Sequence, residues 1–295
     1  MPTKQFFILV LTLLLFILFL PICTLAQKSY TVQGRIINEK GEAVEYVQIG
    51  IPKHNIGTVS TADGHFKINV PGDTLEFHHI SYQVGYYPVS GAADDVVIVL
   101  KEQELPPVVL IAGETKEKYL VRAGANILGN KGGISIVLAS ENFKGEELGS
   151  IAHAKKPFLV KNIILTIRSN SIKGCIASIN IYRIEGKNEK FDNVLAKPIY
   201  FNIPVSQNPQ RFNIQPEDVI MLEPGRYFIA FQIVDCDKEA LKAYLAMPEK
   251  EQQSHRMSLE TAIYFKSSYS REIALGKMHH IPVNIGVAVK GLEYQ

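Results

Sequence analysis

The sequence predicts an all-β protein of two domains, and three observations support this fold class. Short runs rich in β-branched and aromatic residues recur along the chain, and turn residues separate them. Within these runs the apolar positions alternate, as where Phe66, Ile68 and Val70 flank Lys67 and Asn69. The chain has 295 residues, of which 46% are hydrophobic and 20% charged, and this composition suits two globular domains rather than a disordered chain.

Residues 1–26 have the pattern of an export signal. Lys4 provides the basic start, Phe6–Leu20 is a continuous apolar run, and Thr24-Leu25-Ala26 is a small-x-small site that places cleavage between Ala26 and Gln27. We therefore expect an exported protein of the periplasm, outer membrane or cell surface. Its only membrane contact would be through this segment.

Two alternatives to cleavage at this site stay open. An uncleaved membrane anchor needs about 20 apolar residues, and residues 6–25 would just suffice, although Pro21 interrupts them. A lipoprotein would carry its lipid on Cys23, but Ile22 precedes it where lipoprotein signals have Gly, Ala or Ser.

Residues 27–101 form the first predicted domain, a set of strands connected by tight turns. The expected strands are 31–37, 44–51, 66–70, 74–80 and 96–100. The expected turns contain Gly, Pro, Asn or Asp and lie at 38–41, 55–57, 62–64 and 71–73.

The order of residues in this domain also resembles a known family. The matching motifs are Val32-x-Gly34-x-Ile36, Gly41-x-x-Val44, Gly57-Thr58 with Asp63-Gly64-x-Phe66-x-Ile68, and Leu75-x-Phe77 with Ile80-x-Tyr82. This pattern is similar to the carboxypeptidase regulatory-like domain, which Gram-negative bacteria place at the front of many exported proteins. The resemblance implies a prealbumin-like, seven-stranded sandwich. Such a module acts as a docking unit or a spacer and has no catalytic residues.

Residues 102–133 are predicted to be a linker. Pro106 and Pro107 disfavour helix and central strand alike. The run Val108–Ile111 could add to a sheet edge, and the Gly-rich, charged remainder is expected to be an extended connection.

Residues 134–295 form the second predicted domain, a jelly-roll-like β-sandwich. Its expected strands are 159–167, 176–184, 199–203, 212–214, 226–234, 261–265 and 283–289. One helix is expected after Asp237, which can cap it, with Leu241, Tyr244 and Leu245 on one face and Pro248 as its end.

The second half resembles the C-terminal half of exported proteins that carry the regulatory-like module in front. The matching residues are Leu128-Gly129, Gly145-Glu-Glu-Leu-Gly149, Lys155-Lys156-Pro157, Asn180-Ile-Tyr182 and Leu222-Glu-Pro-Gly-Arg-Tyr227. Those proteins have no assigned function, so this resemblance extends the architecture and implies no activity.

Recognisable catalytic and metal-binding motifs are absent from the sequence. No His-Glu-x-x-His occurs, and none of the eight histidines has Glu three residues later. The adjacent pairs His78-His79 and His279-His280 would point to opposite faces of a strand. There is no Gly-x-Ser-x-Gly motif, and the pairs Glu146-Glu147 and Asp94-Asp95 resemble solvated turns. We expect no catalytic residue, metal site or cofactor.

Two cysteines remain if Cys23 leaves with the signal. Cys175 and Cys236 are candidates for a disulfide in an exported protein. Buried free thiols in apolar strands are the alternative.

These observations predict a non-enzymatic binding or structural protein of the cell envelope. Its partner would be a protein or a glycan and not a nucleic acid, because the net charge is only +2 and no long Lys/Arg cluster occurs. The first domain would act as a spacer or docking handle, with any ligand surface on the second domain.

Two other functions stay open. A glycan-binding component of a polysaccharide-uptake system could stack sugars on tyrosines of the second domain, although these would also suit strand packing: Tyr182, Tyr200, Tyr227, Tyr264 and Tyr269. A hydrolase of unrecognised type is the alternative from another class. A TonB-dependent receptor is excluded, because its barrel needs on the order of 22 strands of about 10 residues.

Overall fold

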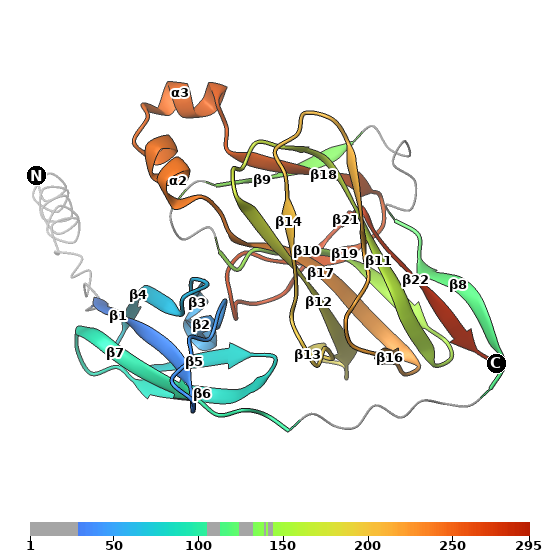
Figure 1. The fold of residues 1–295 in the computed structure, drawn as a ribbon, viewed down its shortest axis with the longest axis horizontal. Coiled ribbons are helices and arrows are strands. Elements are labelled where there is room, and N and C mark those ends of the chain that lie inside the picture. The colour runs from blue at the N-terminus through green and yellow to red at the C-terminus, as the bar shows by residue number, and fades with distance from the viewer. Residues whose placement is uncertain (1–28, 105–112, 124–131, 139, 141–143) are drawn as a thin grey trace, which may run out of the picture.

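The computed structural model describes residues 29–104, 113–123, 132–138, 140 and 144–295. Two all-β domains follow each other along the chain, as Figure 1 shows from blue to red. The expected cleavage site at Ala26 and Gln27 lies outside the described residues. Among the described residues, no helix is long and apolar enough to cross a membrane.

The first domain is a sandwich of seven strands, as predicted. Its strands are β1 (Ser29–Asn38), β2 (Gln48–Ile51), β3 (Ile56–Val59), β4 (His65–Pro71), β5 (Thr74–His79), β6 (Tyr82–Pro88) and β7 (Ala93–Leu100). One sheet has the order β4-β1-β7 and the other β3-β2-β5-β6. Between them Val32, Ile36, Ile49, Leu75 and Phe77 are fully buried, because alternate residues of each strand face inward.

The second domain packs two larger sheets face to face. Its strands are β8 (Thr115–Val121), β9 (Gly133–Val137), β10 (Glu147–Ala154), β11 (Phe158–Asn170), β12 (Cys175–Glu185), β13 (Lys190–Asn193), β14 (Ile199–Ile203), β15 (Gln210–Ile214), β16 (Ile220–Leu222), β17 (Gly225–Asp235), β18 (Ser258–Tyr264), β19 (Ser268–Arg271), β20 (His279–Ile281), β21 (Asn284–Ile285) and β22 (Val287–Tyr294). The seven-stranded sheet follows β13-β12-β17-β10-β19-β20, with β14 also on β12. The eight-stranded sheet follows β21-β18-β11-β22-β8, with β15 and β16 on β11 and β9 on β18.

Side chains of β12 alternate between the two faces of the seven-stranded sheet, so one face is apolar and the other polar. Ala177, Ile179 and Ile181 point into the core of the second domain. Ser178, Asn180 and Tyr182 therefore project from the other face, where Gln48 of the first domain reaches Arg271.

Part of the expected linker belongs to the second domain. β8 lies within residues 102–133, yet it pairs antiparallel with β22 from Thr115–Tyr294 to Val121–Val289. Its exposed charged residues, which suggested a solvated connection, suit an edge strand. The run Val108–Ile111 lies outside the described residues.

The expected helix is confirmed as α2 (Lys238–Leu245). Asp237 Oδ1 accepts a hydrogen bond from the Ala240 amide at 3.0 Å, and Leu241 and Tyr244 are buried. A second short helix, α3 (Glu249–Ser254), begins directly after Pro248.

The two domains share a small buried interface. Tyr46 and Val59 of the first domain cluster with Val234 and Ala274 of the second. The Tyr46 ring also meets Tyr200 edge to face, with ring centroids 4.8 Å apart. These contacts fix the two domains against each other.

Left-handed backbone presents two first-domain residues to this interface. Tyr46 has φ of 50° and Asn55 has φ of 53°, a region that few residues other than glycine adopt. Asn55 Oδ1 accepts a hydrogen bond from the Lys277 amide at 3.0 Å. The Tyr46 turn also explains why β2 begins at Gln48 and not at Val44 as expected.

Cys175 and Cys236 are separate buried thiols in this structure. They lie one residue beyond the cross-strand pair Ile176–Asp235 of β12 and β17, an antiparallel arrangement that brings their backbones close. Burial raises the pKa of Cys175 to about 12 and that of Cys236 to about 11.

The disulfide between them stays a prediction. We expect protein isolated from an oxidising compartment to yield a Cys175–Cys236 linked peptide in a non-reducing map. Closure of this long loop would stabilise the fold by about 4 kcal/mol in the chain-entropy view. Recovery of both as alkylatable thiols after unfolding would contradict the bridge.

Candidate ligand-binding cleft

A cleft of about 550 Å³ lies where the first domain meets the outer face of the seven-stranded sheet. Gln48, His79 and Tyr82 line it from the first domain, and Asn193 and Tyr200 from the second. Its floor is formed by the polar residues of β12 and their partners. The cleft is therefore a product of how the two domains dock.

Strand alternation places the polar floor residues in one row. Ser178, Asn180 and Tyr182 are two residues apart in β12, so their side chains share a face. Gln232 of β17 is the cross-strand partner of Ser178, and its Nε2 donates to Ser178 Oγ at 2.9 Å. Ser178, Asn180 and Gln232 would be unusual on an apolar sheet unless they were hydrogen bonded.

An ion pair lies under this row. Glu147 of β10 and Arg271 of β19 are cross-strand partners, and Arg271 Nη2 is 2.7 Å from Glu147 Oε2. Glu147 is completely buried. Tyr182 donates its hydroxyl to Glu147 Oε1 at 2.8 Å and accepts from Arg271 Nη2 at 3.0 Å.

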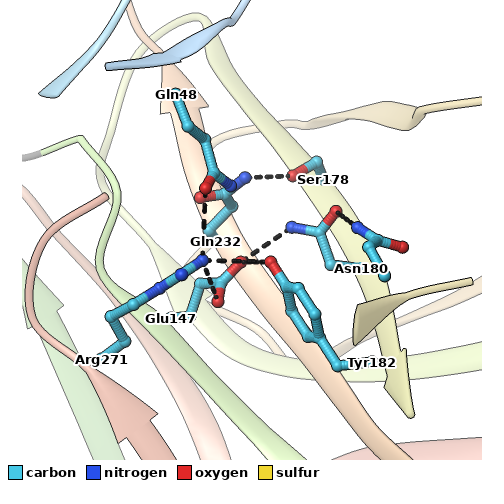
Figure 2. A network of polar contacts seen from close by, with 8 residues as sticks. Gln48, Glu147, Ser178, Asn180, Tyr182, Gln232 and Arg271 are labelled. Atoms are coloured by element: carbon cyan, nitrogen blue, oxygen red, sulfur yellow. Dashed lines mark hydrogen bonds and ion pairs between the residues drawn. The ribbon is translucent and has the colours of Figure 1, made fainter. Parts of the chain in front are cut away.

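Neutral side chains extend the network in both directions (Figure 2). Asn180 Nδ2 donates to Glu147 Oε1 at 2.8 Å, and Asn180 Oδ1 accepts from Asn193 Nδ2 at 3.0 Å. Arg271 Nη2 also donates to Gln48 Oε1 at 3.4 Å, across the domain boundary. The network thus joins five strands of two domains.

The electrostatics of the cleft are close to neutral. Burial alone would lower the pKa of Arg271, but Glu147 and Tyr182 outweigh it and raise that pKa. Burial lowers the pKa of His79 to about 4, so this imidazole is uncharged at pH 7. At the rim, Lys190 Nζ pairs with Asp192 Oδ1 at 2.7 Å. A ligand therefore meets hydrogen-bonding groups rather than a net charge.

Two atoms of the floor have no hydrogen-bond partner among the described residues. They are the donor Arg271 Nε and the acceptor Gln232 Oε1, both buried. A buried polar atom without a partner costs about 1–3 kcal/mol. Neither atom has exposed surface, so this cost belongs to the floor itself and not to contacts with a ligand.

The tyrosines considered from the sequence are distributed over several environments. Tyr182 lies in the floor, and Tyr200 lies in the wall against Tyr46. Tyr227 and Tyr269 are buried, and Tyr264 is half-buried. Strand packing, the alternative given for them, accounts for most of this set.

Glu147 is a correction to the sequence-based interpretation. The pair Glu146-Glu147 was expected in a solvated turn, but Glu147 is the first residue of β10 and has no exposed surface. Its counter-charge comes from Arg271, far along the chain, and no local pattern shows that partnership. Asp94 and Asp95 are exposed as expected, but they lie in strand β7 and not in a turn.

A weak sequence signal for the floor did exist. Asn180 and Tyr182 stand two apart inside a strongly apolar strand, and Gln232 interrupts the apolar run of β17. Polar residues at alternate positions that share one face of neighbouring strands indicate that this face is not packed against the apolar core.

The two histidine pairs lie in different domains and do not form one site. His78 contacts Glu76 at 2.8 Å, and His280 contacts Glu189 at 3.2 Å. Within the described residues, no group of three His, Cys, Asp or Glu side chains could hold a metal ion.

Comparisons with known proteins identify no family for this chain. No family model matches, and no curated protein matches. Among solved structures, a DUF3823 family protein from Bacteroides ovatus shares 11% identity over 70% of this chain and 97% of its own, with a TM-score of 0.21. A DUF3823 family protein from Parabacteroides merdae shares 8% identity over 87% and 98%, with a TM-score of 0.20.

A viral structure shows a similarly distant likeness. The infectious bursal disease virus Gx strain structure shares 11% identity over 90% of this chain and 63% of its own, with a TM-score of 0.27. Similarities at this level carry no functional argument. Membership of the carboxypeptidase regulatory-like family stays a prediction.

Proposed function

We propose that this is a non-enzymatic, exported binding protein whose interdomain cleft takes a neutral, hydroxyl-rich ligand, an oligosaccharide in the first instance. The observation that carries the proposal is the cleft itself. Amide and tyrosine side chains line it, and its charged residues are paired. The expectation that the ligand surface lies on the second domain alone is replaced here by a site that both domains form.

The chemistry of the lining favours sugars. Asn and Gln side chains can each donate and accept, which matches the hydroxyl groups of a saccharide. Tyr46, Tyr82 and Tyr200 add aromatic surface to the same cleft, where apolar ring faces can pack. An anionic ligand would find no unpaired cation at this floor, since Arg271 is neutralised by Glu147.

The arrangement of polar groups favours binding over catalysis. Glu147, the carboxylate beneath the floor, is fully buried and held by Arg271, Tyr182 and Asn180. A general acid or base must reach the substrate. Ser178 Oγ is hydrogen bonded to Gln232, whereas an activated serine needs a base as its partner.

Export rests on the N-terminal sequence pattern. The basic, apolar and small-residue sections of residues 1–26 are typical of a signal peptide. The periplasm or outer membrane is therefore the compartment we propose, where saccharides are available as ligands.

A glycan array followed by isothermal titration calorimetry tests the proposal. We expect the full chain to retain neutral oligosaccharides, and Asn193→Ala to weaken that binding about tenfold, because one good hydrogen bond to a ligand is worth about 1 kcal/mol or more. Lys250→Gln, on the exposed helix α3, is the matched control.

Three outcomes separate the candidate functions. Retention that Asn193→Ala weakens supports the sugar-binding cleft. Turnover of a glycan or ester substrate by purified protein would support the hydrolase and contradict the proposal. Retention of no neutral glycan would leave the protein-binding alternative and reject the ligand class proposed here.

A further inference from the structure

A second and larger cleft, of about 970 Å³, lies between the outer face of the β4-β1-β7 sheet and helix α2. Cross-strand register brings Gln33 beside Lys67 and Arg35 beside His65 on the sheet side. Lys238 and Lys242 line it from the helix side. Figure 1 shows α2 at the end of the second domain that faces β3 and β4.

The charges of this cleft differ from those of the first. Its lining includes five basic residues, Arg35, Lys67, Lys144, Lys238 and Lys242, and three acidic ones, Asp95, Asp235 and Glu239. This excess is not cancelled by close pairing. No carboxylate among the described residues lies within ion-pair distance of Lys67, Lys238 or Lys242.

Lys144 adds a buried positive charge to the wall. Its residue surface is 7% exposed, and its Nζ lies 3.4 Å from Asp235 Oδ1 without a hydrogen bond to any described residue. Burial lowers the pKa of this ammonium group, and Asp235 opposes that effect. A buried cation with one partner at this distance is costly, and further negative charge nearby would stabilise it.

We propose that this second cleft binds an anionic ligand that carries at least two acidic groups and bridges Lys67 on the sheet to Lys238 and Lys242 on the helix. Cations on facing walls of one concave site raise the local concentration of anions. Carboxylate and phosphate share the required chemistry, namely oxygens that accept hydrogen bonds from ammonium groups. The site is separate from the neutral cleft and does not depend on it.

Amine footprinting of the full chain tests this site. The protein is acetylated with acetic anhydride in the presence of trigalacturonate, tripolyphosphate or the neutral sugar maltotriose, and each lysine is quantified by mass spectrometry. We expect at least one of the two anions to slow modification of Lys67, Lys238 and Lys242 severalfold. Lys250 of α3, which is exposed and outside the cleft, should react at an unchanged rate.

Calorimetry with Lys238→Gln/Lys242→Gln provides the second readout. Both residues are exposed, so the double variant should fold, and its affinity for the protecting anion should fall at least tenfold. Lys250→Gln should leave that affinity unchanged. Protection by trigalacturonate alone identifies a carboxylate ligand, and protection by tripolyphosphate alone a phosphate.

The proposal is overturned if neither anion protects the three lysines, if Lys250 is protected equally, or if the double variant binds as tightly as the unaltered chain. Maltotriose should not protect these lysines. Binding of neutral sugar that survives in the double variant would belong to the other cleft, so the two proposals can fail separately.

Discussion

Replacing Arg271 with methionine should lower the free energy of unfolding by about 3–5 kcal/mol, the usual cost of leaving one member of a buried ion pair alone. Glu147 would lose its counter-charge while it has no exposed surface, and only the neutral donors Tyr182 and Asn180 would remain beside it. Urea unfolding followed by circular dichroism gives the measurement.

Two further variants show whether the cost comes from the unpaired charge. Arg183→Met removes a half-buried partner of the exposed Glu185, 2.7 Å away, and should cost at most about 1 kcal/mol. The double variant Glu147→Leu/Arg271→Met removes both charges and should recover much of the lost stability. If Arg271→Met costs no more than Arg183→Met, the ion pair does not hold the floor together.

The strands were the part of this fold most accessible from sequence. β12, β14 and β17 were predicted within one residue at each end because β-branched runs and turn residues mark them locally. The cap of α2 was accessible for the same reason, since Asp237 and Ala240 are three residues apart. Local chemistry decides such features.

The site was not accessible in the same way, because its contacts join distant segments. Gln48 and Arg271 are 223 positions apart, and Glu147 and Arg271 are 124 positions apart. A single sequence shows where polar residues interrupt an apolar strand, but it does not show which element covers them. β8 is a related case, since its pairing with β22 depends on a strand at the far end of the chain.

Docking of the two domains depends on a close approach at Gly57, and Gly57→Val should undo it. A Cβ at Gly57 would lie 1.9 Å from the Ala274 carbonyl oxygen of the second domain. The Ala274 oxygen is a backbone atom, so it cannot turn aside as the end of a flexible side chain would. Within its own domain the nearest atom to the same Cβ is the Ile49 oxygen at 3.3 Å, so the first domain should still fold.

We expect Gly57→Val to separate the domains while each keeps its strands. The circular dichroism spectrum should be unchanged, the radius of gyration from small-angle X-ray scattering should rise, and thermal unfolding should resolve into two transitions. Neutral-sugar binding should be lost, because Gln48 and Tyr46 would leave the cleft. Gly91→Val is the matched control, since a Cβ there meets nothing within 4 Å.

This variant distinguishes a cleft that both domains build from a surface of the second domain alone. In the first case, undocking abolishes binding without unfolding either domain. Overpacking at one contact costs about 1–3 kcal/mol, and here that cost destabilises the interface and not the core of either domain. In the second case, the row Ser178, Asn180 and Tyr182 would become more open and would bind the same ligand at least as well. Unchanged scattering together with unchanged binding would mean that the approach of Gly57 to Ala274 does not govern docking.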